Sequence, residues 1–310
     1  MRILTGTVLF ALVVSCSQKN TQVDLAFEKD LIPEGFAIDA QAKKVYLNSL
    51  KLNKIVRCNL DGSNAEDFIA SNQYGYLSGF GMMVRGDTLF ALGNVLPKKG
   101  NKSILLLMCI STKKPIATYT IENEQFIYLN DLAVDSKGTV YITDSESSDI
   151  YTVNKATGSL EVFFSHDEIK HCNGITVSPD DKLLYLASYT SGIRILDITT
   201  KKLVNLPNDH KGIDGMKFHK NNLFAIVNAR RDPSLNGVFQ YVLNGKGKEI
   251  QSSKKIREFE DPSDIPTTFA IYGDSMYFVS DSQLDNFDQE SNEIIAPEKL
   301  ENYRLVHQKL

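Results

Sequence analysis

The sequence has no tryptophan, only four cysteines among its 310 residues, and no basic stripe or basic tail. With a net charge of −4 and no basic patch, the chain lacks the electrostatic features of nucleic-acid-binding proteins. Four widely spaced cysteines do not make a disulfide framework. Helix-like spacing of apolar residues over ten or more positions is also missing, which argues against a helical domain.

The first residues, MRILTGTVLFALVVSCS, differ from the rest of the chain. One arginine precedes an apolar run that is too short to span a bilayer comfortably, as in signal peptides. The tetrad VVSC resembles the lipobox of bacterial lipoproteins, which implies cleavage before Cys16 and lipidation of its thiol. We therefore predict a signal peptide over 1–15, a lipidated Cys16 with a tether over 16–23, and a protein anchored in the bacterial cell envelope, periplasmic or surface-facing. A plain secretion signal with an incidental cysteine is the alternative.

The other three cysteines are predicted to be structural. Cys58 and Cys109 lie in the strand-like runs KIVRCNL and ILLLMCI, where we expect them to be small buried apolar residues. Cys172 precedes a strand, and we favour a packing role for it over that of a nucleophile.

Short apolar runs broken by Gly, Asp, Asn and Ser dominate the chain and indicate strands. One unit recurs: an apolar strand, a polar turn, and a second strand with an aromatic residue at a fixed place. The copies are GFAIDAQAKKVYLNS, GFGMMVRGDTLFALGN, NDLAVDSKGTVYITDS, NGITVSPDDKLLYLAS, DGMKFHKNNLFAIVN and TTFAIYGDSMYFVSD. Their aromatics are Tyr46, Phe90, Tyr141, Tyr185, Phe224 and Tyr277, with gaps of 44, 51, 44, 39 and 53 residues.

A repeat of this length with about four strands is typical of a β-propeller blade. Six copies predict an all-β fold over 24–310: a six-bladed β-propeller with four-stranded blades around a central channel. The N-terminal segment DLAFEK has no partner in its own unit, and we expect it to add a strand to the last blade. A sandwich with long insertions is the competing fold, but it does not account for the regular period.

Polar residues recur just before the innermost strands. Two positions before each apolar core lie Glu34, Gly79, Asn130, Asn173, Asp214 and Thr267. Since the first strand of each blade lines the channel, these residues are predicted to form a ring. Two carboxylates and two amides supply hard oxygen ligands with a charge of −2, which suits a divalent cation such as Ca²⁺, Mg²⁺ or Mn²⁺ better than structural zinc. The alternative is that they are ordinary turn residues, although Glu34 is a poor one.

The segments PEG, NDLAVDSKGTVYITD, NGITVSPDDKLLYLASY and IDGM resemble the regucalcin/gluconolactonase (senescence marker protein) family, and more distantly the paraoxonases. The resemblance covers most of the chain after the tether. It implies one divalent cation, most often Ca²⁺ with Mg²⁺, Mn²⁺ or Zn²⁺ as alternatives, held by Glu34, Asn173 and Asp214. It also implies that Asn130 contacts substrate or water, and that the substrate is a lactone or ester.

The chain departs from the family in two units. The second reads YLSGFGMMV and offers no match to the Arg and Asn that bind sugar hydroxyls in gluconolactonases. The last, PTTFAIYGDSMYFVSDSQLD, looks more like a bacterial lipoprotein branch. These departures leave the substrate open.

The sequence is therefore compatible with two functions. The first is a metal-dependent hydrolase of a lactone or related ester, in which Asp214 positions or deprotonates the attacking water. His171, in the loop FFSHDEIKHCNG, is a candidate proton shuttle, although a surface histidine is the simpler reading. The second is a non-catalytic, lipid-anchored propeller that binds a sugar, peptide or protein with a structural ion. In both cases we expect a monomer that contacts membrane only through its lipid.

Overall fold

The computed structural model describes residues 22–97, 101–122, 126–228 and 232–310. In this part of the chain the regular structure consists of strands and short 3-10 turns, without an α-helix. The predicted all-β class is thus confirmed. The predicted signal peptide over 1–15, the lipidation site Cys16 and most of the tether lie outside the described residues. No helix in the described ranges has the length and apolar character needed to cross a membrane.

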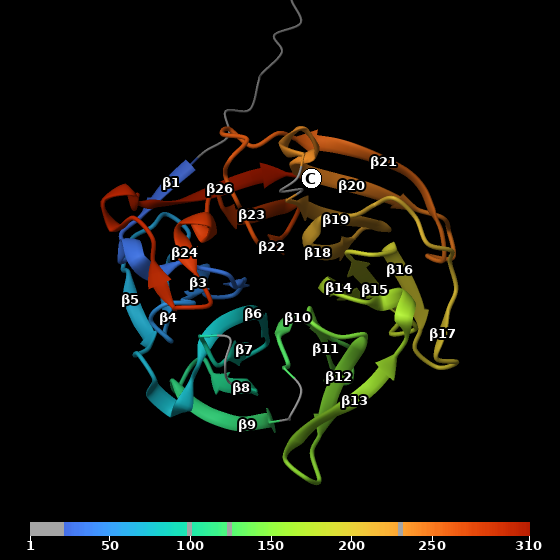
Figure 1. Ribbon diagram of the computed structural model, residues 1–310, viewed down its shortest axis with the longest axis horizontal. Helices are drawn as coiled ribbons and strands as arrows, with labels where there is room; N and C mark the ends of the chain where they lie inside the picture. Colours follow the sequence, from blue (N-terminus) through green and yellow to red (C-terminus); the bar gives the residue numbers. More distant parts are fainter. Residues whose placement is uncertain (1–21, 98–100, 123–125, 229–231) are drawn as a thin grey trace, which may run out of the picture.

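Antiparallel four-stranded units, here called meanders, stand around a central axis (Figure 1). Three of them are separate sheets made of consecutive strands. Their strands, from the axis outward, are β2 (Phe36–Asp39), β3 (Lys44–Asn48), β4 (Ile55–Asn59) and β5 (Glu66–Ile69); β14 (Cys172–Val177), β15 (Leu183–Ser188), β16 (Gly192–Asp197) and β17 (Lys202–Leu203); and β18 (Ile213–His219), β19 (Asn222–Val227), β20 (Gly237–Leu243) and β21 (Ile250–Arg257).

Two further meanders share one eight-stranded sheet. Their strands are β6 (Ser78–Arg85), β7 (Thr88–Asn94), β8 (Lys102–Cys109) and β9 (Lys114–Glu122), and β10 (Leu129–Val134), β11 (Val140–Asp144), β12 (Asp149–Asn154) and β13 (Ser159–Ser165). A single parallel pair, Ser159 with Thr120, joins the outer strands β13 and β9. The propeller architecture is confirmed, whereas the count of six blades stays a prediction, because hydrogen bonding merges these two units.

The first and last strands of the described chain close the ring. The last sheet has the order β1 (Gln22–Leu25), β26 (Tyr303–Lys309), β23 (Ser275–Val279) and β22 (Phe269–Tyr272). Strand β1 pairs antiparallel with β26 (Figure 1). The expected closure by the N-terminal segment is therefore confirmed, and the strand begins two residues before the predicted boundary at 24.

The connections that matter for the site lie where the inner strands β2, β6, β10, β14, β18 and β22 begin. One of them, residues 280–302 between β23 and β26, is much longer than the others that the structure describes in full. It contains the small hairpin β24 (Phe287–Asp288) and β25 (Glu293–Ile294). The short 3-10 turns are η1 (Lys29–Leu31), η2 (Gln73–Gly75), η3 (Asp167–Ile169), η4 (Pro233–Leu235), η5 (Leu284–Asn286) and η6 (Pro297–Lys299).

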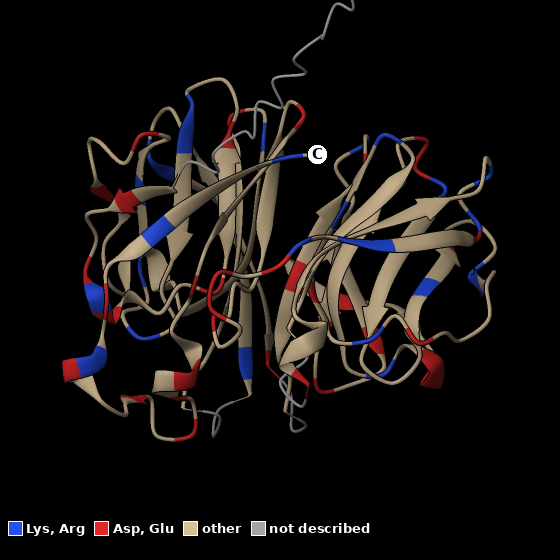
Figure 2. Ribbon diagram, turned by 90° about the horizontal axis from the view of Figure 1, so that it is seen from above, with Lys and Arg blue, Asp and Glu red and all other residues tan. Residues whose placement is uncertain are grey.

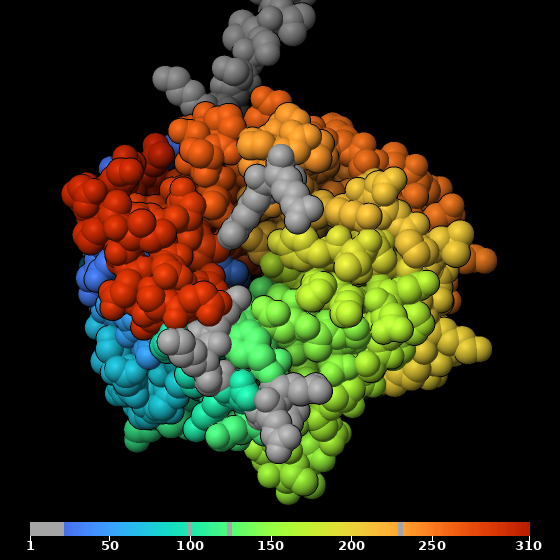
Figure 3. Space-filling view, viewed as in Figure 1, coloured from blue at the N-terminus to red at the C-terminus, as the bar shows by residue number. Residues whose placement is uncertain are grey.

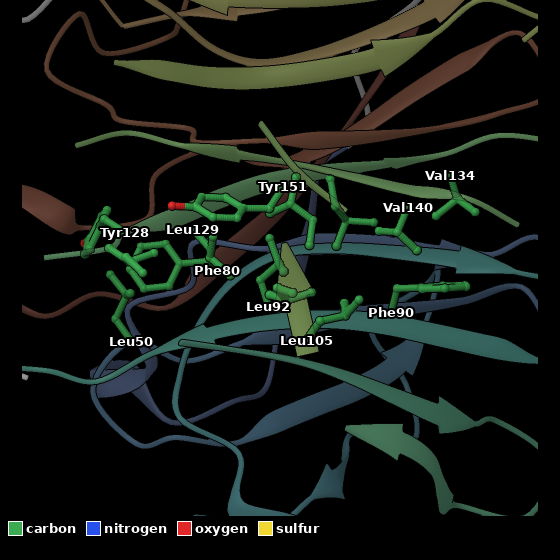
Figure 4. Packing of buried hydrophobic residues seen from close by; sticks show 14 of the residues in the cluster. Leu50, Phe80, Phe90, Leu92, Leu105, Tyr128, Leu129, Val134, Val140 and Tyr151 are labelled. Carbon is green, nitrogen blue, oxygen red and sulfur yellow. The ribbon is translucent and has the colours of Figure 1, made fainter. Parts of the chain in front are cut away.

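The hydrophobic core consists of clusters between neighbouring meanders. In the cluster between β6–β9 and β10–β13, Phe80, Leu92, Leu105 and Tyr128 face one another (Figure 4). Burial of such a side chain stabilises the fold by about 1.5–3 kcal/mol relative to exposure. Five of the six repeated aromatics are buried in the same way, while Tyr277 is half-buried. Their fixed place in the second strand thus reflects packing between units.

Charged residues lie mainly in the loops and at the rim. Acidic and basic side chains are interspersed in the side view (Figure 2). This agrees with the lack of a basic stripe in the sequence.

Ring closure generates a first prediction. Leu25 in β1 is 1% exposed and packs with Tyr303 and Leu305. Leu25→Ala should lower the free energy of unfolding by about 2–3 kcal/mol, since it leaves a cavity at the closure. Asp24→Ala, on the exposed side of the same strand, should change it by less than about 0.5 kcal/mol. Urea unfolding of both variants measures this, and equal effects would mean that β1 does not hold the ring closed.

Candidate functional site

Four inner strands carry the same irregularity. Pairing with the second strand shifts by one residue in β6, β10, β14 and β18. Each shift is a β-bulge, in which two residues oppose one. The bulge residues are Phe80 and Gly81, Asn130 and Asp131, Asn173 and Gly174, and Asp214 and Gly215. Three predicted ring residues are therefore the first residues of bulges at equivalent places.

The remaining ring positions follow from the same pairing. Glu34 and Thr267 lie two residues before Phe36 and Phe269, which pair with the residue after the repeated aromatic. In β6 the equivalent residue is Phe80, and the predicted Gly79 is wrong by one position, since Gly79 pairs with Gly93 outside the bulge. In the sequence, Gly81 is indistinguishable from the apolar core that follows it, although it is the second bulge residue.

The five polar ring residues are almost buried. Their exposures lie between 6% for Thr267 and 9% for Glu34. Hydrogen bonds to backbone carbonyls tie neighbouring positions together: the Thr267 hydroxyl donates to the Glu34 carbonyl at 2.7 Å, and the Gly215 amide donates to the Thr267 carbonyl at 2.8 Å. Asn130, Asn173 and Asp214 thus lie at the start of three successive inner strands, and Glu34 lies before β2 at the same end of the channel.

Glycine follows several ring residues because neighbouring strands nearly touch there. A Cβ atom on Gly174 would lie 2.5 Å from the Asp214 carbonyl oxygen, and one on Gly35 would lie 2.0 Å from the Phe80 carbonyl oxygen. Such distances exclude a side chain unless the backbone moves. In the pair Asn173-Gly174, the asparagine therefore supplies the polar ring residue, and the glycine leaves room for the backbone of the next inner strand.

Asn228, directly after β19, is a site residue that the sequence analysis missed. Its Nδ2 donates to Asp214 Oδ2 at 3.0 Å and also to the Pro266 carbonyl. Both neighbours can only accept, which fixes the orientation of the amide. Asn228 Oδ1 is buried and has no hydrogen-bond partner in the described structure, so it adds an oxygen beside Asp214. A signal existed, since Asn48 and Asn94 end the second strands β3 and β7.

Beyond the ring, the channel is apolar. A cavity of about 220 Å³ is lined by residues of all the inner strands, from Phe36 to Ile271. Lys217 is the one charged residue of this lining in the described chain. Its Nζ lies 2.8 Å from Asp131 Oδ2, so an ion pair links β18 to β10 across the channel.

His171 lies just before β14, at the mouth of the channel, which is the end where the inner strands begin. Its Nδ1 lies 2.8 Å from the Ser145 carbonyl oxygen, and since a carbonyl can only accept, Nδ1 carries the proton. The preceding turn η3 is held by an ion pair of 2.7 Å between Glu168 and the buried Arg194. His171 therefore has a fixed ring orientation, whereas a role as proton shuttle stays a prediction.

The cysteines occupy three different environments. Cys172 is fully buried, and burial raises the pKa of its thiol far above the usual range, which agrees with packing and disfavours a nucleophile. Burial also raises the pKa of Cys58 to about 12. Cys109 was predicted to be buried, and this is wrong: it lies at the end of β8, partly exposed, with its sulfur 3.2 Å from Asp87.

The connection 280–302 borders the mouth on one side. Leu284 and Phe287 pack in the same cluster as Phe80 and Tyr128, and Lys51 forms an ion pair of 3.0 Å with Glu293. In the space-filling view the red segment that contains β24 and β25 covers this side of the face up to its centre (Figure 3). The ring position of β6 is therefore occupied by an aromatic residue, Phe80, which packs against the connection 280–302. The polar ring residues belong to the other inner strands.

A pair of carboxyl groups lies near Thr267. Burial and the neighbouring Asp281 and Asp261 raise the pKa of Asp264 to about 6, and Arg304 offsets this in part. Burial also raises the pKa of Asp281, which accepts hydrogen bonds from the Ile265 and Gln283 amides.

The ring can offer a cation only hard oxygen donors. Within the described ranges, no group of three or more His, Cys, Asp or Glu side chains is placed to hold a metal ion. The ring has two carboxylates and the amide oxygens of Asn130 and Asn173, and Asn228 adds a further amide oxygen beside Asp214. This donor set fits Ca²⁺ or Mg²⁺ and is unlike a zinc site.

Comparison with known families places the chain. A family profile described as SMP-30/Gluconolactonase/LRE-like region matches residues 32–222. The chain belongs to this family. The matched region of this SMP-30/gluconolactonase-like chain includes Glu34, Asn130, Asn173 and Asp214. No curated protein sequence matches it.

Solved structures share the fold at low identity. A luciferin-regenerating enzyme has a TM-score of 0.60 at 14% identity, with 93% of this chain and 94% of that chain covered. A gluconolactonase from Xanthomonas campestris has a TM-score of 0.59 at 12% identity, with coverage of 93% and 90%. A virginiamycin B lyase from Staphylococcus aureus has a TM-score of 0.58 at 13% identity, with coverage of 94% and 99%. These likenesses show the propeller fold and no particular activity.

The raised pKa of Asp264 predicts a pH effect on stability. The folded state holds this proton more tightly than the unfolded state, whose carboxyl has a pKa near 3.8. The free energy of unfolding should therefore fall as pH rises from about 4 to about 6. Asp264→Asn should remove this fall and be more stable than the parent at pH 7.5 by about 1 kcal/mol, a value reduced for solvent screening of a half-buried group. At pH 4 the difference should vanish.

The control is Asp61→Asn. Hydrogen bonds from Ser63 lower the pKa of Asp61, so its replacement should not stabilise the protein at pH 7.5. Urea unfolding at both pH values decides the point. An Asp264→Asn protein that is no more stable than the parent at pH 7.5 would contradict the raised pKa.

Proposed function

We propose that the protein is a divalent-cation-dependent hydrolase of a lactone or related ester. The observation that carries the proposal is the equivalent placement of Glu34, Asn173 and Asp214 at one end of the channel, at the first bulge residues or their counterparts. Membership of the SMP-30/gluconolactonase-like family supports the reaction class. A structural neighbour that is a gluconolactonase agrees with it.

In this proposal Glu34, Asn173 and Asp214 hold the cation, with Ca²⁺ preferred over Mg²⁺, Mn²⁺ and Zn²⁺. A bound cation would polarise the substrate carbonyl and stabilise the charge that develops on its oxygen. Asn228 fixes the Asp214 carboxylate through the 3.0 Å hydrogen bond to Oδ2. Asp214 is thereby oriented to position the attacking water and to accept its proton.

Two further residues complete the proposed site. The Asn130 amide orients the substrate by hydrogen bonds to its polar atoms. His171 exchanges the proton with solvent through Nε2, the nitrogen that is basic when Nδ1 donates to Ser145.

The main test uses the full-length protein in detergent. Bound metal is measured after exposure to Ca²⁺, and hydrolysis of a panel of lactones, carboxylic esters and phosphotriesters is followed with and without chelator. Asp214→Ala should weaken Ca²⁺ binding at least tenfold and lower lactone turnover at least a hundredfold. Asp61→Ala, which removes an exposed turn carboxylate, should leave both unchanged.

The outcomes separate the two candidate functions. Full metal content in Asp214→Ala would show that the ion site is elsewhere. Metal bound at the ring without turnover of any substrate in the panel would favour the non-catalytic propeller with a structural ion, which binds a sugar, peptide or protein.

We also propose that the protein is a monomer anchored by a lipid on Cys16 after removal of residues 1–15. The basis is the lipobox-like tetrad VVSC. Cells fed labelled palmitate should incorporate label into the parent and not into Cys16→Ser, and the parent should fractionate with membranes. Label retained in Cys16→Ser would contradict the assignment.

A further inference from the structure

Two inner-strand residues break a pattern that the other units follow. Directly after the ring position, most units have glycine: Gly35, Gly81, Gly174 and Gly215. Three residues after the ring position, the other units have Ala37, Met83, Ala133, Thr176 and Ala270. Asp131 has a carboxylate at the position that is usually glycine. Lys217 has a charge at the position that is uncharged in the other units. These two exceptions pair with each other at 2.8 Å.

The pair joins two inner strands that are not direct neighbours, and its carboxylate is buried. It joins β10 to β18, and β14 lies between these two strands around the ring (Figure 1). The Asp131 side chain is 5% exposed and that of Lys217 is 22% exposed. Asp131 Oδ1 accepts the Leu132 amide at 2.8 Å, so the backbone fixes the carboxylate as well. The other residues that line the cavity beside Lys217 are uncharged.

The pair also lies beside two of the polar ring residues, Asn130 and the candidate cation ligand Asp214. Asp131 follows Asn130 in the same bulge, so their Cα atoms are about 3.8 Å apart. Lys217 follows Asp214 by three residues on one strand. Because the Asp131 side chain is almost fully buried, its charge is screened less by solvent than that of a surface carboxylate. The carboxylate of Asp131 therefore belongs to the same electrostatic environment as Glu34 and Asp214.

We propose that Lys217 is an internal counter-ion that keeps Asp131 out of the cation site and holds the effective charge of the ring at −2. Lys217 thereby limits the affinity of the site and maintains its preference for divalent over trivalent ions. The inference rests on the proposed function, since it concerns the cation held by Glu34, Asn173 and Asp214. Without the ammonium group, Asp131 is a buried carboxylate without its counter-ion, and a cation in the ring becomes its nearest compensating charge.

The test measures ion binding directly. Full-length protein in detergent is titrated with CaCl₂ by calorimetry and with TbCl₃ by luminescence. Lys217→Met should bind Ca²⁺ at least tenfold more tightly than the parent and gain more for Tb³⁺ than for Ca²⁺. Asp131→Asn, which leaves the ammonium unpaired, should bind Ca²⁺ at least tenfold more weakly. The double variant should return to within about threefold of the parent.

Lys220→Met is the matched control. Lys220 lies on the exposed turn after the same strand and pairs with Asp274, so its loss should change both affinities by less than twofold. Melting temperatures measured in chelator and in millimolar Ca²⁺ give a second readout. Lys217→Met should melt lower than the parent in chelator and gain more from Ca²⁺.

The outcomes distinguish this inference from the proposed function. A parent that binds neither ion overturns the cation site and this inference with it. A parent that binds Ca²⁺, together with unchanged affinity in Lys217→Met, overturns the inference alone and leaves the pair as a link between β10 and β18. If Lys217→Met does not fold, Asp131→Asn and the double variant carry the test, and equal affinities in those two would likewise overturn it.

Discussion

The close approach of neighbouring inner strands is the constraint on which the rest of the structure depends. Meanders that converge on one axis must bring their inner strands nearly into backbone contact, as at Gly174 and the Asp214 carbonyl. A bulge and a glycine at that point relieve the crowding. The first residue of the same bulge, such as Asn173, is polar in three of these strands and lies at the end of the channel where the inner strands begin. Packing and site formation are therefore two results of one local geometry.

This constraint explains why polar residues persist in an otherwise apolar channel. Side chains such as Asn48, Asn94 and Asn228 hydrogen-bond across to the inner strand of the next meander or to the residues just before it. They satisfy backbone groups that a bulge removes from the sheet ladder. Asn228 also holds Asp214, so the network that joins the meanders also orients a candidate ligand. The ion pair of Asp131 and Lys217 adds a charged link between strands that do not pair.

Particular residues show how far the sequence could lead. The repeated aromatic and the apolar alternation predicted the inner strands, and thereby placed Glu34, Asn130, Asn173 and Asp214 in one register. The same approach failed at Gly79, because a bulge of the form Phe-Gly reads as part of an apolar run. It also gave no warning that Cys109 is partly exposed, since the end of a strand is not visible in an apolar sequence pattern.

The sequence by itself determined the all-β propeller, the closure by its first strand and the polar register of the channel, because each of these follows from local periodicity and repetition. The tertiary structure alone decided which residues from distant units meet. Asn228 and Pro266, Asp131 and Lys217, and the connection 280–302 with Phe80 come together only when the units pack around the axis. The physical reason is that such contacts depend on the angle and spacing between units, which no single repeat encodes.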